Sequence, residues 1–298
     1  MFLLLVAYAS LLGFLGLSIY KAIQYGKMPM HGRLDLYPIP KEKGRGAYGG
    51  SYYEEPEWWK KPRETTFIGE LIDMLKEMLF IKKLFENQRP LWWISYSLHL
   101  GIYMLIAWTC LLFIGAITEL AGLPFSSGHW WTVLLYYATF LVGTAGAFLT
   151  AFGSGALLLK RIFVHEFKIY TTLQEYLNLF FIFIVVISGL AVWATDPVIN
   201  NGRRIAKRML TFSPIEANAV LTLHILLLGA LLIYIPLSKM SHYVGKYFSF
   251  HKVLWDNEPN LPNSTIDKKI RAGAGSPPPK NNWSAPHWQP DAPKTKEM

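Results

Sequence analysis

The sequence predicts an all-α integral membrane protein: a bundle of five transmembrane helices with a cytoplasmic amphipathic helix and an extended C-terminal tail. Of the 298 residues, 52% are hydrophobic and only 16% are charged, whereas soluble chains carry roughly 25% charged residues. The charges are also missing from five long runs, residues 1–20, 90–118, 120–159, 176–195 and 217–238. Each run reaches the roughly 20 residues that a helix needs to cross a membrane.

Two of these runs need adjustment before they are taken as helices. The third contains Gly, Ser and Pro near its start, so we expect its helix over residues 129–159. The first run has no basic residues before it and no clear cleavage site, while Lys21 and Lys27 follow it. We therefore expect residues 1–20 to be a retained helix with the N-terminus outside rather than a signal peptide.

The distribution of Lys and Arg predicts the orientation in the cytoplasmic (inner) membrane of the cell. Residues 21–89 and 160–175 are rich in these cations, and residues 119–129 have none. Basic loops stay in the cytoplasm, which places the N-terminus outside and the C-terminus inside. The basic loop 196–216 breaks this pattern. The formal charge of +9 is then explained by anionic membrane lipid, without nucleic acid.

The segments between and after the helices have distinct patterns. Residues 21–89 form a predicted cytoplasmic loop that contains an amphipathic helix over residues 67–88, with apolar side chains at helical spacing. Residues 90–250 are the predicted four-helix membrane core. Residues 251–298 are polar and rich in Pro, so we expect an extended cytoplasmic tail in which the aromatic stretch "NNWSAPHW" docks on a partner through Trp283 and Trp288.

Histidines are the candidate functional residues. The segment "LHILLLGALLIYIPLSKMSH" reads as one helix with His224 and His242 separated by 18 residues, 242 minus 224. That spacing is about five turns, so both would share a face about 27 Å apart along the axis, too far to bind one metal. His99 lies near the cytoplasmic end of the second helix and could face His242 at the same depth. Two neutral imidazoles on opposing helices are a typical axial pair for a low-spin haem b.

Other roles for these histidines stay open. An intramembrane histidine can simply form a hydrogen bond with a neighbouring helix, which would suit a haem-free membrane anchor. A histidine-based transporter is another alternative, but the uncharged runs contain no Asp or Glu, and proton-coupled transporters usually need such carboxylates. Cys110 is the single cysteine. A cysteine-ligated iron–sulfur cluster would therefore have to come from another chain.

Three stretches carry a resemblance to a known family. "SLHLGIYMLIAWT", "LLLKR…TT" and "LTLHILLLGALLIYIPLSKMSH" resemble the membrane cytochrome b (gamma) subunit of respiratory nitrate reductase, over roughly residues 85–250. The resemblance implies a five-helix bundle with two stacked b haems between the second and fifth helices. It further implies that His99 and His242 ligate the haem on the cytoplasmic side, and that His224 ligates the outer haem.

The chain departs from that family at one position. The family has a second histidine ten residues after the first on the second helix, and here that position is Thr109. The outer haem would then have another ligand, be five-coordinate or be absent. His129, at the outer end of the third helix, is the candidate sixth ligand.

The "WSAPHW" tail is similar to the ends of cytochrome b subunits in sulfite-reductase-linked menaquinol complexes and in membrane heterodisulfide reductase. This likeness implies electron transfer between menaquinone or menaquinol and a cytoplasmic iron–sulfur subunit resembling the heterodisulfide reductase catalytic subunit. The chain would be an electron-transfer subunit of a quinol-linked oxidoreductase, and whether it is itself an enzyme stays open.

Overall fold

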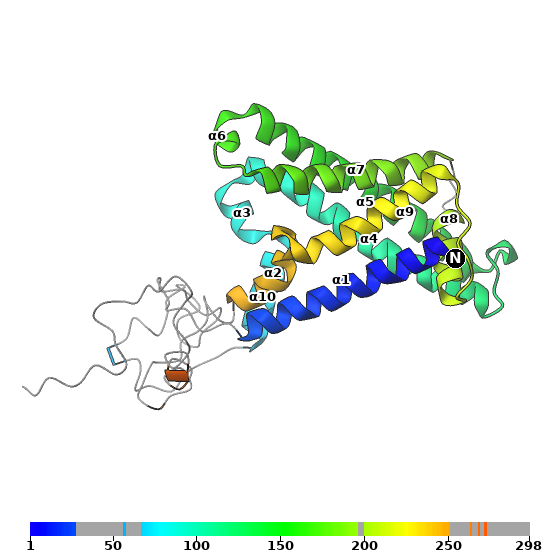
Figure 1. The fold of residues 1–298 in the computed structure, drawn as a ribbon, viewed down its shortest axis with the longest axis horizontal. Coiled ribbons are helices and arrows are strands. Elements are labelled where there is room, and N and C mark those ends of the chain that lie inside the picture. The colour runs from blue at the N-terminus through cyan, green and yellow to red at the C-terminus, as the bar shows by residue number, and fades with distance from the viewer. Residues whose placement is uncertain are drawn as a thin grey trace, which may run out of the picture. The chain divides into compact units, whose positions relative to one another are not determined.

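The computed structural model describes residues 1–27, 56–57, 67–195, 200–250, 263, 268 and 271–272. Every regular element in these residues is a helix. Five of them are long and apolar enough to cross a membrane (Figure 1): α1 (Phe2–Lys27), α4 (Arg89–Leu120), α5 (Trp130–Phe163), α7 (Leu173–Thr195) and α9 (Ala219–Leu237). Trp283, Trp288 and nearly all of the predicted tail 251–298 lie outside the described residues.

Shorter helices connect or flank these five. They are α2 (Phe67–Phe80), α3 (Lys82–Asn87), η3 (Phe125–Ser127), α6 (His165–Lys168), α8 (Asn200–Leu210), η4 (Lys239–Ser241) and α10 (His242–Ser249). The chain divides into two compact units, residues 1–22 with 75–244 and residues 23–74 with 245–298. In the second unit the rings of Tyr25 and Phe248 lie 5.8 Å apart. All packing described below belongs to the first unit.

The long helices of the first unit pack in a row. Helix α4 packs along α5, α5 along α7, and α7 along α9. Residues of α1 then cover the other side of α9, where Leu3 and Leu4 share a buried cluster with Leu221 and Ile225.

Glycines bring α4 and α5 close together. A Cβ on Gly101 would lie 2.4 Å from Thr150 Oγ1, and a Cβ on Gly153 would lie 2.4 Å from the backbone nitrogen of Leu98. Small residues allow such close backbone approach between membrane helices.

The predicted helix over residues 67–88 is wrong as a single element. It is split at Ile81, whose φ and ψ of 51° and 51° are left-handed, a conformation that costs an ordinary residue about 1–2 kcal/mol. Hydrogen bonds on both sides hold this bend. Trp92 Nε1 donates to Phe80 O at 2.7 Å, and the backbone N–H of Lys83 donates to Glu77 Oε2 at 2.8 Å. Periodicity alone did not show the bend because the apolar stripe continues across it.

The single helix expected over residues 223–242 is also wrong. Helix α9 contains Pro236 in its last turn and ends at Leu237, and Ser238 is extended, with φ −109° and ψ −179°. Proline removes one backbone donor and disfavours continuation of the helix. Ser238 Oγ then accepts the backbone N–H of Met240 at 3.1 Å and caps a new turn. His224 and His242 therefore lie on different helices, α9 and α10, shown separately in Figure 1.

The basic segment 196–216, expected to be a loop, contains helix α8, which packs on the end of α4. Its Ala206 is buried with Leu112 of α4. Arg203 Nε lies 2.9 Å from Glu119 Oε1, and Lys207 Nζ lies 3.3 Å from Glu119 Oε2. Two of the cations that contradicted the orientation pattern are thus paired with a carboxylate of the bundle.

Candidate metal-ligand site

His99 lies on α4, ten residues after the helix begins at Arg89. Its Nδ1 is 2.7 Å from the carbonyl oxygen of Ser95, one turn earlier on the same helix. A carbonyl oxygen can only accept a hydrogen bond, so Nδ1 carries the proton and donates it. The remaining ring nitrogen, Nε2, then has a free lone pair, which is the state that binds a metal.

His242 is the first residue of α10 and follows the turn η4. Its Nδ1 lies 3.3 Å from the carbonyl oxygen of Lys239, so the same argument leaves Nε2 of His242 unprotonated. The His242 side chain is exposed, and His99 is half-buried. A ligand can therefore approach the pair from the exposed side of His242.

The structure brings these two histidines together. Their ring centroids lie 6.2 Å apart, with an angle of 67° between the ring planes. A metal–imidazole nitrogen bond is about 2 Å long. Two such bonds, added to the distance from each ring centre to its bonded nitrogen, give a separation between the ring centres close to the observed 6.2 Å. The spacing of the pair is therefore compatible with one metal ion held between the two Nε2 atoms.

Two histidines can serve as the axial ligands of a haem iron. Within the described residues, no group of three or more His, Cys, Asp or Glu could hold a metal by itself. A haem supplies four nitrogen ligands of its own, so the protein needs to add only one or two axial ligands. The His99 and His242 pair fits that requirement.

His224 has different neighbours. Its Nδ1 lies 2.9 Å from Ser188 Oγ on α7, and Ser188 itself donates to the carbonyl oxygen of Val185 at 2.7 Å. A Cβ on Gly189 would lie 3.1 Å from His224 Cε1, so the absence of a side chain at Gly189 leaves space for the ring. The ring packs against α7, and Nε2 is again the nitrogen left without a proton.

Neither Thr109, at the position of the family's second histidine, nor His129, the candidate sixth ligand, is among the described hydrogen-bond partners of His224. Thr109 is exposed, and its hydroxyl donates to Leu105 O of its own helix at 2.9 Å. His129 caps the start of α5, where its Nδ1 accepts the backbone N–H of Trp131 at 3.2 Å. A neutral histidine that accepts at Nδ1 carries its proton on Nε2, so His129 does not present a metal-binding nitrogen.

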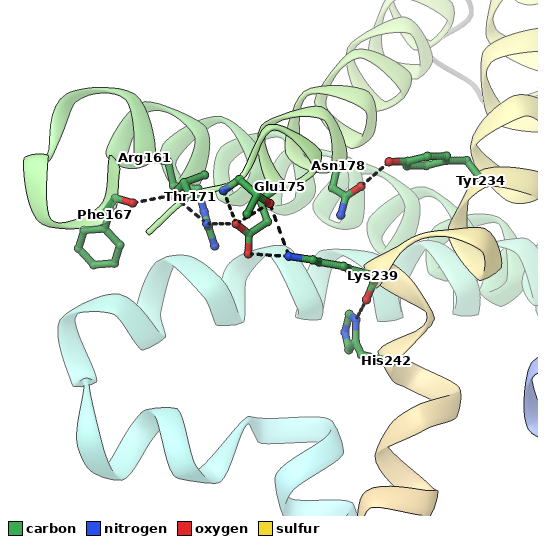
Figure 2. Close-up of polar contacts among 9 residues, drawn as sticks. Arg161, Phe167, Thr171, Glu175, Asn178, Tyr234, Lys239 and His242 are labelled. Carbon is green, nitrogen blue, oxygen red and sulfur yellow. Dashed lines mark hydrogen bonds and ion pairs between the residues drawn. The ribbon is translucent and has the colours of Figure 1, made fainter. Parts of the chain in front are cut away.

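Sequence reasoning missed a polar cluster beside His242. Figure 2 shows Glu175 on α7 facing Arg161 of α5 and Lys239 of η4, with Asn178 and Tyr234 one turn further along. Glu175 Oε2 lies 3.8 Å from Arg161 Nη1, and Tyr234 OH donates to Asn178 Oδ1 at 2.8 Å. The order Thr172-x-x-Glu175 is a capping-box pattern, and this was the available signal for the cluster.

The bend between α2 and α3 also lies next to His99. Tyr103, whose ring is 6.4 Å from that of His99, donates its hydroxyl hydrogen to Met78 O at 2.6 Å. The rings of Trp92 and Tyr96 stack 4.6 Å apart on the same helix. The end of α2 is thus anchored to α4 within one turn of the candidate ligand.

Comparison with protein-family models, with curated proteins and with solved structures finds no match to this chain.

Proposed function

We propose that this chain is a membrane cytochrome b, which transfers electrons between menaquinone or menaquinol and a cytoplasmic iron–sulfur partner subunit. The observation that carries the proposal is the pair formed by His99 and His242, with ring centroids 6.2 Å apart and both Nδ1 atoms bonded to backbone carbonyls. Five helices long and apolar enough to cross a membrane support a membrane location.

Haem b, when bound, supplies a one-electron redox centre within the membrane. The chain's own contribution is to hold two neutral imidazoles at a fixed separation, with their Nδ1–H groups directed to Ser95 and Lys239. Such outer hydrogen bonds fix the tautomer and the orientation of a ligating histidine and raise its basicity. We expect the Nδ1 bonds to be as necessary as the histidines themselves.

The proposed orientation places this pair on the cytoplasmic side. The start of α4 and the ends of α5 and α9 share one end of the bundle, because successive helices run in opposite directions. Lys160, Arg161 and Lys239 lie at that end. Basic residues favour the cytoplasmic side, where an iron–sulfur partner would be within reach of the haem.

The test is a pair of substitutions with a matched control. His99→Ala and His242→Ala should each remove the same low-spin b haem, because each supplies one axial ligand to one iron. His165→Ala is the control, since His165 is exposed on the short helix α6 at the same end of the bundle. Redox difference spectra and haem quantification on the purified full-length chain provide the measurement.

Three outcomes are informative. Loss of one common low-spin haem in both variants, with a normal spectrum in His165→Ala, supports the pairing. Loss of different haems in the two variants would show that His99 and His242 do not share an iron. A wild-type protein without any haem spectrum would instead indicate a membrane anchor and reject the proposed function.

A further inference from the structure

Lys239 contacts two different elements with two different parts of the residue (Figure 2). Its side-chain Nζ lies 3.9 Å from Glu175 Oε1 on α7. Its backbone carbonyl oxygen accepts the hydrogen bond from His242 Nδ1 at 3.3 Å. One residue therefore connects the carboxylate of α7 to the imidazole of α10.

Glu175 itself is held from several directions. Its Oε2 accepts hydrogen bonds from the backbone N–H of Thr172 at 2.7 Å and from the Thr172 hydroxyl at 3.1 Å. Arg161 Nη1 lies 3.8 Å from the same oxygen and donates to Thr171 Oγ1 at 3.2 Å. The carboxylate is thus fixed between the end of α5 and the start of α7.

These ion pairs are poor candidates for a purely stabilising role. The side chains of Arg161, Glu175 and Lys239 are 30%, 28% and 54% exposed, and the charged atoms are close to 4 Å apart. Ion pairs of this kind contribute about 0–1 kcal/mol each. The pair formed by Lys239 and Glu175 nevertheless links the η4 turn to α7.

We propose that Glu175 is a positioning residue for His242, acting through Lys239. The inference rests on the proposed function and extends it. The orientation of the His242 ring depends on where the Lys239 carbonyl lies, because that carbonyl accepts the hydrogen bond from Nδ1 of the ring. Ser238 fixes one end of the turn by capping Met240. Glu175 fixes the turn from the side by holding the Lys239 ammonium group.

The competing explanation is that Glu175 only caps α7. Lys239 Nζ also donates to Thr172 Oγ1 at 3.5 Å, but the cap itself consists of the bonds from the Thr172 backbone N–H and hydroxyl to Glu175. Substitution of Lys239 leaves those two bonds in place and so separates the two explanations. Lys239→Gln removes the cation and keeps the carbonyl, whereas Glu175→Gln removes the carboxylate charge and keeps the side-chain size. Lys239→Arg keeps the cation and serves as the conservative variant.

The experiment uses the full-length haem-loaded protein and two readouts besides activity. The first readout is the low-spin electron paramagnetic resonance signal that His242→Ala should abolish, chosen because this signal depends on the angle between the axial imidazole planes. The second readout is the midpoint potential of the same haem. Glu175→Gln and Lys239→Gln should both change this signal in the same direction with haem retained. Each substitution removes the ion pair between residues 175 and 239, so the Lys239 carbonyl that accepts the His242 hydrogen bond can move. Lys239→Arg should keep the wild-type signal.

A purely electrostatic influence predicts a different pattern. Loss of a negative charge and loss of a positive charge would move the midpoint potential in opposite directions and leave the resonance signal unchanged. That pattern would overturn the positioning role. A changed signal in Glu175→Gln with a normal signal in Lys239→Gln would assign Glu175 to helix capping alone and would also overturn it.

Glu119→Gln is the matched control. Glu119 likewise sits between two cations, Arg203 at 2.9 Å and Lys207 at 3.3 Å, at the other end of α4. This variant should leave the His242 haem signal unchanged, and an equal change would point to general loosening of the bundle and overturn the inference. Absence of haem from the wild-type protein rejects the proposed function and the inference together, whereas the other negative outcomes reject the inference alone.

Discussion

The Nδ1 atoms of His99, His224 and His242 lie 2.7, 2.9 and 3.3 Å from oxygen atoms. Two of these oxygens are backbone carbonyls, and the third belongs to Ser188, whose hydrogen is donated to Val185. Each oxygen therefore accepts the hydrogen bond, and each ring keeps its lone pair on Nε2. His129 has the opposite arrangement because its Nδ1 accepts a backbone N–H.

At the residue scale this difference predicts the state of the outer haem. We expect two haems in the wild-type protein, with the outer one ligated by His224 alone and therefore high-spin. His224→Ala should reduce the haem count to one. His129→Ala should leave the spectrum unchanged, because its imidazole is used to cap α5. Haem stoichiometry and electron paramagnetic resonance provide the measurement.

Two results would count against this assignment. A stoichiometry of one haem in both wild type and His224→Ala would leave His224 as a hydrogen-bonding link between α7 and α9. A wild-type outer haem that is low-spin and turns high-spin in His129→Ala would show that His129 moves from its capping position to ligate the iron.

At the scale of elements, the close approach of α4 and α5 holds His99 in place. Gly101, two residues after His99, faces Thr150 at a distance that leaves no room for a methyl group. Gly101→Ala should lower the stability by about 1–3 kcal/mol, as overpacking does in a filled interior. Thermal unfolding in detergent, followed by loss of the low-spin haem band, measures the effect.

Gly16→Ala on α1 is the control for that prediction. A Cβ on Gly16 meets nothing within 4 Å, and replacing a helical glycine by alanine in open space stabilises a helix by about 0.5–1 kcal/mol. The two substitutions should therefore act in opposite directions. Equal stability of Gly101→Ala and wild type would mean that α4 and α5 can separate without affecting the haem.

Hydropathy was sufficient to predict the five long helices, since an uncharged run of membrane length has few other stable conformations. It could not predict where helices bend. The break at Ser238 follows Pro236 and coincides with the end of the uncharged run 217–238, so proline chemistry rather than hydropathy carried the signal for it. The bend at Ile81 lies in a continuous apolar stripe. Helix α8 was missed because its cations suggested a loop, whereas Glu119 of α4 pairs with two of them.

The candidate site was partly predictable. The expectation that His99 and His242 face each other needed only that both lie near the same end of the bundle. It did not depend on a continuous fifth helix, so the break at Ser238 does not affect it. The contacts of His224 with Ser188 and Gly189, and the link from Glu175 through Lys239, depend on which helices are neighbours. A single sequence does not contain that information.

At the scale of the whole molecule, the two ends of the bundle differ in chemistry. One end carries His99, His242 and the Glu175 cluster, and the other carries Glu119 with the cations of α8. The α2–α3 bend adjoins the first end through Tyr103 and Trp92. We expect the amphipathic segment 67–88 and the tail 251–298 each to contribute to the docking surface for the iron–sulfur partner.

Truncation after Asp256 tests this docking surface. It should release the partner without loss of haem, because His99 and His242 are retained while Trp283 and Trp288, the expected anchors, are removed. Buried aromatic residues dominate the energy of many interfaces. Co-purification with a tagged partner, together with a haem spectrum, measures both effects, and a truncated chain that keeps the partner at normal affinity would contradict the proposal.

The break at Ser238 has a consequence for how related sequences can vary. In one continuous helix, a single inserted residue between His224 and His242 would rotate one imidazole relative to the other by about 100°. Here the regular helical rotation of α9 stops at Leu237. The direction of His242 depends in addition on the Ser238 cap and the η4 turn. A related chain that lengthens or shortens the fifth membrane helix, to suit a thicker or thinner bilayer, therefore needs a compensating change in the turn 238–241, where non-helical backbone can restore the direction of the His242 imidazole.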